Sequence, residues 1–342
     1  GEWIEYEKHN QQENKALTRC RSSVLCASCV HWRAADHRHH PYYAQAGQEP
    51  DGAAGGFFHY YPRPAPEGEE DISDHYQINE TSSALLTGTA DAGDAYQEQT
   101  LFIGDSNTVR LYANGLISLQ QFCAKEGIGT SAALNEGIVT FKRDDNRYTI
   151  AQAVAKMKPR RVVIMLGTND NGMNTEDFIS NYTALVQAIQ ASYPYTDIIV
   201  NTVPPVPSNH SNYPNMDQTR IDDFNMALLT MCEQLGVKFL NSAEALKDAN
   251  GYGNVDYYQS GDIHLKPAGL KVLLKYLRTH AYETEDRRPD TNNIPTRAEY
   301  TAKPNSAVEA PSSSEAVSSS VVEEKNRSIR RTIVWTKPAA AP

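Results

Sequence analysis

RVVIMLG, residues 161–167, is a continuous apolar run that ends in glycine, and it indicates a parallel strand buried on both faces. TLFIG at 100–104 is a shorter run of the same kind. DIIVNTV at 197–203 stops at two prolines, as a strand does, and VKFL at 237–240 is a fourth candidate strand.

Amphipathic segments separate these strands. The apolar residues within 178–189 share one helical face, and Asn174 or Thr175 can cap that helix. A second helix is indicated over 221–235, and a last one begins near Pro267, a residue well suited to a first turn. Alternation of strand and helix predicts a doubly wound α/β fold with a central parallel sheet, in which ligands bind beyond the carboxyl ends of the strands.

Composition divides the 342 residues into three parts. Residues 36–70 are rich in proline, glycine and charge, and residues 302–328 are rich in serine, proline and glutamate, so neither stretch can build a core. We therefore expect a low-complexity, disordered extension over 1–98, one folded domain over 99–283, and a disordered tail over 284–342.

Charge and hydropathy restrict the partners. The net charge of −10 argues against nucleic acid, because binding to phosphates needs a basic face. No stretch approaches the ~20 apolar residues of a membrane span. No secretory signal is visible, yet the low-complexity flanks are typical of linkers in exported proteins, so we expect an extracellular or cell-surface location. The sequence does not predict the oligomeric state.

Two polar motifs directly follow predicted strands. GDSN at 104–107 places Ser106 at a strand-to-helix turn, where its hydroxyl can enter a site and backbone N–H groups can bind an oxyanion. The alternative interpretation is that this serine or its neighbouring aspartate only caps the next helix. GTND at 167–170 places the amide of Asn169 at the next strand end, where it can donate to an oxyanion, although the motif also suits a simple turn.

A third motif, GDIHLKPAG at 261–269, precedes the last helix and supplies a general base for a serine. Within 99–283 the other histidines are His210, which lies in a proline-rich loop, and His280, which lies at a helix end. Only His264 has an adjacent carboxylate and a position at a strand end, so we select it as the base.

In this order the three motifs resemble the SGNH hydrolase superfamily, the GDSL-type esterases and lipases. The resemblance covers about 99–283 and implies a three-layer α/β/α sandwich of flavodoxin-like topology. It further implies that Ser106 is the nucleophile and His264 the general base, and that the Ser106 N–H and the Asn169 side chain are oxyanion donors. No metal or organic cofactor is implied.

The chain departs from this family pattern at two places. The family's glycine oxyanion donor matches Gly127 best, but the family usually has an asparagine two residues before that glycine, where this chain has Lys125, so Gly129 is the alternative. The family's catalytic aspartate stands three residues before the histidine, where this chain has Gly261. Asp262, two residues before the histidine, lies on the same side of an extended backbone and can replace it, and Asp256 is a second candidate.

The resemblance implies a serine-dependent carboxylic ester hydrolase that works through an acyl-enzyme, and the bacterial branch that it is similar to suggests O-acetyl groups on a glycan as substrate. The alternatives are a catalytically impaired domain that binds a glycan or a partner, and a lysophospholipase or thioesterase. An N-terminal cluster has the residue types of a zinc site, but its irregular spacing leads us to predict no metal. The cluster consists of Cys20, Cys26, Cys29, His31, His37, His39 and His40.

Overall fold

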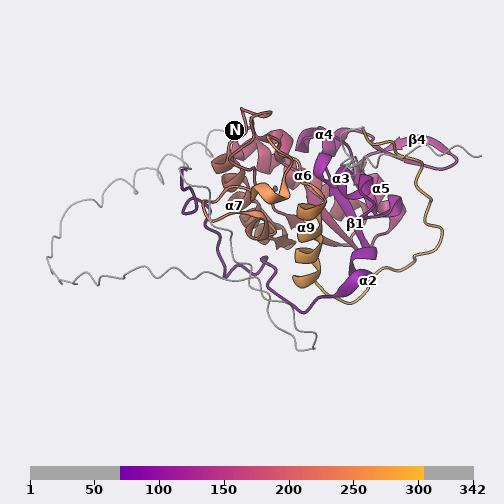
Figure 1. The fold of residues 1–342 in the computed structure, drawn as a ribbon. Coiled ribbons are helices and arrows are strands. Elements are labelled where there is room, and N and C mark those ends of the chain that lie inside the picture. The colour runs from indigo at the N-terminus through magenta and orange to yellow at the C-terminus, as the bar shows by residue number, and fades with distance from the viewer. Residues whose placement is uncertain (1–69, 304–342) are drawn as a thin grey trace, which may run out of the picture. The chain divides into compact units, whose positions relative to one another are not determined.

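The computed structural model describes residues 70–303, and their core is a five-stranded sheet (Figure 1). In sheet order the strands are β2 (Phe122–Ala124), β1 (Thr100–Gly104), β5 (Arg161–Met165), β6 (Asp197–Asn201) and β7 (Lys238–Leu240). All four neighbouring pairs are parallel. The predicted central parallel sheet is confirmed, and its strand order is that of flavodoxin-like folds.

Helices cover both faces of the sheet, because successive strand residues point to opposite sides. Leu101 and Ile103 pack in one apolar layer, whereas Phe102 packs in the other. The first layer is formed with α4 (Thr130–Asn135), α5 (Ile150–Met157), α6 (Thr175–Ser192) and α7 (Gln218–Leu235). The second is formed with α2 (Gly93–Glu98), α3 (Ser106–Ala113), α8 (Ala243–Leu246) and α9 (Pro267–Thr279). The three-layer α/β/α sandwich is therefore also confirmed.

Short elements complete the architecture. An antiparallel hairpin of β3 (Val139–Phe141) and β4 (Asp144–Tyr148) lies at the right of Figure 1, on the side away from α7. Three single turns of 3₁₀ helix connect the larger elements: η1 (Leu119–Gln121), η2 (Thr168–Asp170) and η3 (Val255–Tyr257). The second and third of these lie in the loops that form the candidate site.

Residues 70–98, which we assigned to the low-complexity extension, contribute to the folded unit. The Leu86 N–H donates to the Phe239 carbonyl at 2.9 Å, and the Phe239 N–H donates to the Ala84 carbonyl at 2.8 Å. This pairing extends the sheet beyond β7, and Tyr96 of α2 is buried against the sheet. The ordered structure thus begins before the predicted boundary at residue 99.

The C-terminal boundary also differs, because residues 296–298 pair with the hairpin. The Lys142 N–H donates to the Thr296 carbonyl at 2.9 Å, and the Ala298 N–H donates to the Thr140 carbonyl at 3.0 Å. Between them Arg297 is only 3% exposed. Pairing with a distant segment orders this stretch, which its own composition does not reveal. The rest of both predicted flanks, 1–69 and 304–342, lies outside the described residues.

Candidate active site

The strand order opens a crevice at the carboxyl ends of β1 and β5. The chain leaves β1 into α3 on one face of the sheet and leaves β5 through η2 towards α6 on the other face. Ligands bind where connections diverge in this way. Ser106 is the first residue of α3, and Asn169 lies within η2, so both predicted residues lie at this crevice.

Ser106 is held by the start of α3. The preceding Asp105 caps this helix, and its carboxylate accepts the Asn107 N–H at 3.0 Å. Ser106 itself is 9% exposed. Because the first backbone N–H groups of a helix have no acceptor within the helix, they remain able to stabilise negative charge beside the Ser106 hydroxyl.

The structure brings Ser106, His264 and Asp262 together in a line. The Ser106 Oγ lies 3.0 Å from His264 Nε2, and His264 Nδ1 lies 2.6 Å from Asp262 Oδ1. A proton on Nδ1, donated to the carboxylate, leaves Nε2 to accept the serine hydroxyl proton. This is the arrangement in which an imidazole activates a serine.

Asp262 reaches His264 although it lies only two residues away. Its Oδ1 also accepts the N–H groups of Ile263 at 2.6 Å and of His264 at 3.1 Å. Burial raises the pKa of Asp262, but hydrogen bonds and the charge of His264 outweigh burial and hold this pKa below its usual value. Gly261 makes the turn with φ of +70°. The alternative Asp256 is exposed in η3, and the contact with His264 comes from Asp262.

Asn169 is exposed although its neighbours Thr168 and Asp170 are buried. Its Nδ2 donates to the Ile128 carbonyl at 3.1 Å and lies 3.5 Å from Asp105 Oδ2. The amide therefore lies between the serine turn and the loop that follows β2, where it can donate to an oxyanion.

Both candidate glycines lie in that loop, on either side of Ile128. Gly127 has φ of +73° within a turn closed by the Ile128 N–H and the Lys125 carbonyl at 3.4 Å. Gly129 caps α4, and a side chain there would meet the Asp170 carboxylate at 2.8 Å. That carboxylate accepts the N–H of the next residue in the loop, so η2 and this loop are fixed together. Both glycines thus lie next to the carbonyl that Asn169 contacts.

Asp105 is the fully buried charge of the site. Burial raises its pKa to about 6, although the Asn107 N–H and the charge of His264 oppose this rise. The group therefore titrates in the range in which a histidine titrates.

Three residues near Ser106, His264 and Asp262 were not predicted from the sequence to belong to the site. Asn107 accepts the Leu265 N–H at 3.0 Å and ties α3 to the histidine loop. The Tyr213 ring meets the His264 ring edge-on, with centroids 5.7 Å apart. Arg110, one turn after Ser106, is buried on α3. An asparagine inside a helix is a weak signal in the sequence, and the other two carry none.

A pocket of about 350 Å³ adjoins Asn169, and its rim is rich in amide groups. Its lining residues are Thr168, Asn169, Asn171, Gly172, Asn212, Tyr213, Pro214, Asn215 and Met216. The loop that carries Tyr213 is tied to the catalytic loop, since the Asn212 N–H donates to the Gly261 carbonyl at 2.9 Å. The pocket therefore lies beside Asn169 and beside Tyr213, the residue whose ring meets that of His264.

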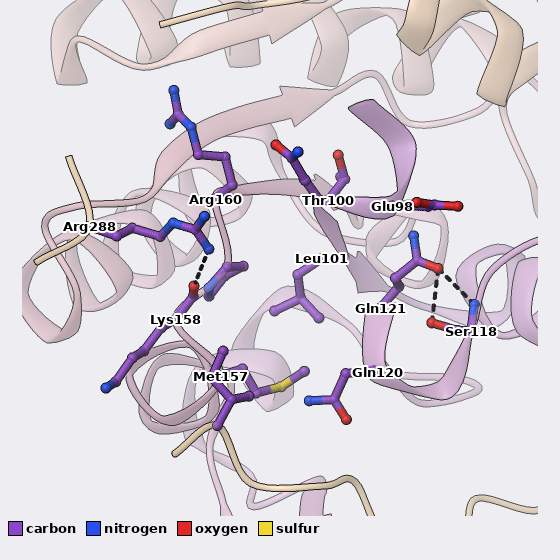
Figure 2. Close-up of a pocket in the computed structure, with 13 residues that line it drawn as sticks. Glu98, Thr100, Leu101, Ser118, Gln120, Gln121, Met157, Lys158, Arg160 and Arg288 are labelled. Atoms are coloured by element: carbon purple, nitrogen blue, oxygen red, sulfur yellow. Dashed lines mark hydrogen bonds between the residues drawn. The ribbon is translucent and has the colours of Figure 1, made fainter. Parts of the chain in front are cut away.

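A larger cavity, of about 490 Å³, lies at the opposite, amino end of β1 and β5 (Figure 2). Its cations already have partners: Arg160 pairs with Asp197 at 2.6 Å, and Arg288 donates to the Lys158 carbonyl at 3.1 Å. Because none of its lining residues pairs a nucleophile with a base, it is not the candidate active site.

The remaining candidate residues have structural surroundings. His280 stacks on Tyr276, with ring centroids 3.7 Å apart. The ring nitrogens of His210 face the carbonyls of Pro207 and Met216, at 2.5 and 3.2 Å. The N-terminal cysteine and histidine cluster lies outside the described residues.

Residues 70–303 contain neither a set of candidate metal ligands nor a candidate membrane span. Within that range no group of three or more histidine, cysteine or acidic side chains is arranged to hold a metal ion. Over the same residues, no helix combines the length and apolar character needed to cross a membrane.

Comparison with known proteins identifies a family. The model of the GDSL-like lipase/acylhydrolase family matches residues 102–272, half of the 342-residue chain. No curated protein matches the chain.

Three solved structures are similar to this chain over about half of its length. A GDSL-like lipase from Bacteroides thetaiotaomicron is 17% identical, over 55% of this chain and 88% of that chain, with a TM-score of 0.41. A lipase/acylhydrolase from Enterococcus faecalis is 19% identical, over 52% and 93%, with a TM-score of 0.39. A carbohydrate esterase of family 3 from Talaromyces cellulolyticus is 20% identical, over 52% and 93%, with a TM-score of 0.37.

Proposed function

The chain belongs to the GDSL-like lipase/acylhydrolase family and is an esterase of this SGNH type, and from this premise we propose that it hydrolyses carboxylic esters through an acyl-enzyme on Ser106. The observation that carries the proposal is the line from the Ser106 hydroxyl through His264 to Asp262, with contacts of 3.0 and 2.6 Å.

The first half-reaction acylates the serine. As Ser106 Oγ attacks the ester carbonyl, His264 Nε2 takes the hydroxyl proton, and the ionised Asp262 stabilises the imidazolium that forms. Collapse of the tetrahedral intermediate breaks the bond to the alcohol oxygen, which receives the same proton from His264. The alcohol leaves, and the acyl group remains on the serine.

The oxyanion of that intermediate needs donors that are already in place. The Ser106 N–H at the start of α3 and the Asn169 Nδ2 lie on two sides of the crevice. We assign the third donor to the Gly127 N–H, with Gly129 as the alternative in the same loop. In the second half-reaction His264 deprotonates a water molecule, which attacks the acyl carbonyl and releases the acid and the free serine.

We favour an O-acetyl group on a glycan as the substrate. The pocket beside Asn169 offers the side chains of Asn171, Asn212 and Asn215, whose amides can bind hydroxyl groups, and the Tyr213 ring offers a face for a sugar. A long acyl chain requires an extended apolar lining, and this pocket offers three apolar side chains, those of Tyr213, Pro214 and Met216. An extracellular or cell-surface location, suggested by the linker-like flanks, gives access to such a polymer.

The nucleophile is tested with Ser106→Ala and p-nitrophenyl acetate. Because the hydroxyl supplies the only nucleophile in this mechanism, we expect turnover to fall by at least about 10³-fold and a fluorophosphonate to stop labelling the protein. An unchanged thermal unfolding curve is the control. Turnover that survives in the folded variant would reject the acyl-enzyme proposal, and a wild-type protein that binds glycans without turnover would favour the binding domain.

The substrate class is tested with p-nitrophenyl esters of increasing chain length, alongside acetylated xylan and acetylated peptidoglycan. We expect the acetyl ester to be preferred and acetate to be released from a polymer. Tyr213→Ala should raise the KM for the polymer more than that for p-nitrophenyl acetate, with Tyr195→Ala as the exposed control on another surface. A rate that grows with chain length would instead favour a lysophospholipase or thioesterase.

A further inference from the structure

Arg110 is a buried cation one helical turn after the nucleophile. It lies four residues after Ser106 on α3, so the two side chains share a helix face. Its residue exposure is 3%, and its Nη2 donates to Gln259 Oε1 at 3.2 Å. Burial of a guanidinium costs free energy unless hydrogen bonds and opposite charge compensate it. The groups around Arg110 must therefore supply this compensation.

Gln259 is the first residue of the loop that carries His264. Its N–H donates to the His264 carbonyl at 3.2 Å, and its carbonyl accepts the Asp262 N–H at 3.1 Å. The loop over 259–264 is thus closed on itself at Gln259. The bond from Arg110 to the Gln259 side chain joins this closed loop to the helix that carries Ser106.

The charge of Arg110 also acts on the same loop. Burial lowers the pKa of Arg110, while the negative charge of Asp262 and the Tyr213 phenol oppose this change. The guanidinium and the Asp262 carboxylate therefore attract each other, which adds to the hydrogen bond through Gln259.

We propose that Arg110 is a positioning residue: its hydrogen bond to Gln259 fixes the loop over 259–264, and with it the imidazole of His264, against the helix that carries Ser106. The proposal rests on the proposed roles of Ser106 and His264.

The test compares Arg110→Gln, which shortens the side chain and loses the bond from the guanidinium to Gln259, with Arg110→Lys, which keeps a donor of similar reach but not the planar fork. Arg161→Gln is the matched control, because Arg161 is equally buried but lies at the amino end of β5, where it donates to the Tyr96 carbonyl. The readout is the separate measurement of kcat and KM for p-nitrophenyl acetate, together with thermal unfolding.

Without the bond from residue 110 to Gln259, the loop over 259–264 is no longer fixed to α3, so His264 and Ser106 meet less often in the productive geometry. We therefore expect Arg110→Gln to lower kcat by about tenfold with little change in KM. Arg110→Lys should lower kcat several-fold, and Arg161→Gln should change neither kcat nor KM.

Two results would overturn the inference. They are an unchanged kcat in folded Arg110→Gln, and an equal loss of kcat in Arg161→Gln. If Arg110→Gln does not fold, Arg110→Lys still decides, because an unchanged kcat there would exclude the positioning role. Failure of the proposed function is distinguishable, since Ser106→Ala would then retain turnover whatever kcat the Arg110 variants show.

Discussion

Asp262 and Gly261 show how a single position changes the role of its neighbour. A glycine with φ of +70° turns the backbone so that the next carboxylate, not the side chain at 261, faces His264. The carboxylate then accepts two backbone N–H groups of its own loop as well as the imidazole. Its orientation is thus fixed by three donors.

Asp262→Asn tests this role directly. An asparagine fits the same space, but its amide favours the wrong histidine tautomer, and the corresponding change in serine proteases lowers kcat by about 10⁴-fold. We expect a loss of at least about 10²-fold in kcat for p-nitrophenyl acetate, with little change in KM. Asp256→Asn is the control, because Asp256 is exposed in η3. Near wild-type turnover in Asp262→Asn would remove this residue from the mechanism.

Asp105 makes stability depend on pH. Burial raises its folded-state pKa from 3.8 to about 6, so the folded state holds this proton more tightly than the unfolded state does. The resulting stabilisation is complete below the unfolded pKa and is lost as the pH rises through about 6. Between pH 4.5 and 7.5 the loss amounts to about 2 kcal/mol.

Asp105→Asn should remove this dependence, because asparagine can still cap α3 but does not titrate. Urea unfolding of both proteins at pH 4.5 and 7.5 measures the effect. We expect the stability of the variant relative to wild type to improve by about 2 kcal/mol at the higher pH. An identical difference between the two proteins at both pH values would contradict the assigned pKa.

At the scale of elements, the sequence predicts the strands and helix caps that depend on a local pattern of residues. The runs at 161–167 and 197–203 predict strands, and β5 and β6 occupy their first five residues. The cap of α6 is Asn174, whose side chain accepts the Asp177 N–H at 2.8 Å. The pairing of 84–86 with β7 was not predicted, because it depends on contacts between residues far apart in the chain.

The same distinction holds for the candidate site. Ser106, Asn169 and His264 were selected because each combines a chemical motif with a strand or helix boundary, and the folded chain brings the first and third within hydrogen-bonding distance. Arg110 and Tyr213 were not selected, because each contacts the site through a residue more than 40 positions away in the chain. A lone arginine or tyrosine in the sequence gives no indication of such a partner.

The loop over 259–264 yields a prediction of its own. Moving the acid back to the family position, in the double variant Gly261→Asp/Asp262→Asn, should not restore activity. A Cβ atom at position 261 would lie 2.8 Å from the Ser211 hydroxyl and 3.5 Å from the Asn212 amide nitrogen. Its nearest neighbours are therefore the side chains of these two residues. We expect kcat to stay within about threefold of Asp262→Asn alone. Recovery of activity would show that the loop rearranges to the family geometry.

At the scale of the whole molecule, the C-terminal segment connects the hairpin to the candidate oxyanion loop. Arg297 donates to the carbonyls of Phe122 in β2 and of Thr140 in β3. The Tyr300 ring then packs on the Phe122 ring with centroids 4.7 Å apart, and its hydroxyl donates to Glu126. Glu126 is the neighbour of Gly127, so a segment assigned to the tail on composition supports the site from outside.

This connection predicts different effects for two truncations. A chain that ends after residue 283 loses Arg297 and Tyr300, leaves the Phe122 and Thr140 carbonyls without these donors, and should lose on the order of 3 kcal/mol of stability. A chain that ends after residue 303 keeps every one of these contacts and should unfold at the wild-type temperature. Thermal unfolding and p-nitrophenyl acetate turnover of both chains measure the difference.

Tyr300→Phe separates support of the loop from global stability. It removes only the hydroxyl that donates to Glu126 and keeps the ring that packs on Phe122. If this hydrogen bond fixes the loop over 125–129, kcat should fall by about threefold to tenfold while the unfolding temperature changes little, because the oxyanion donor loses its fixed position. Tyr195→Phe, on an exposed tyrosine elsewhere, is the control. An unchanged kcat in Tyr300→Phe would limit the C-terminal segment to a role in stability.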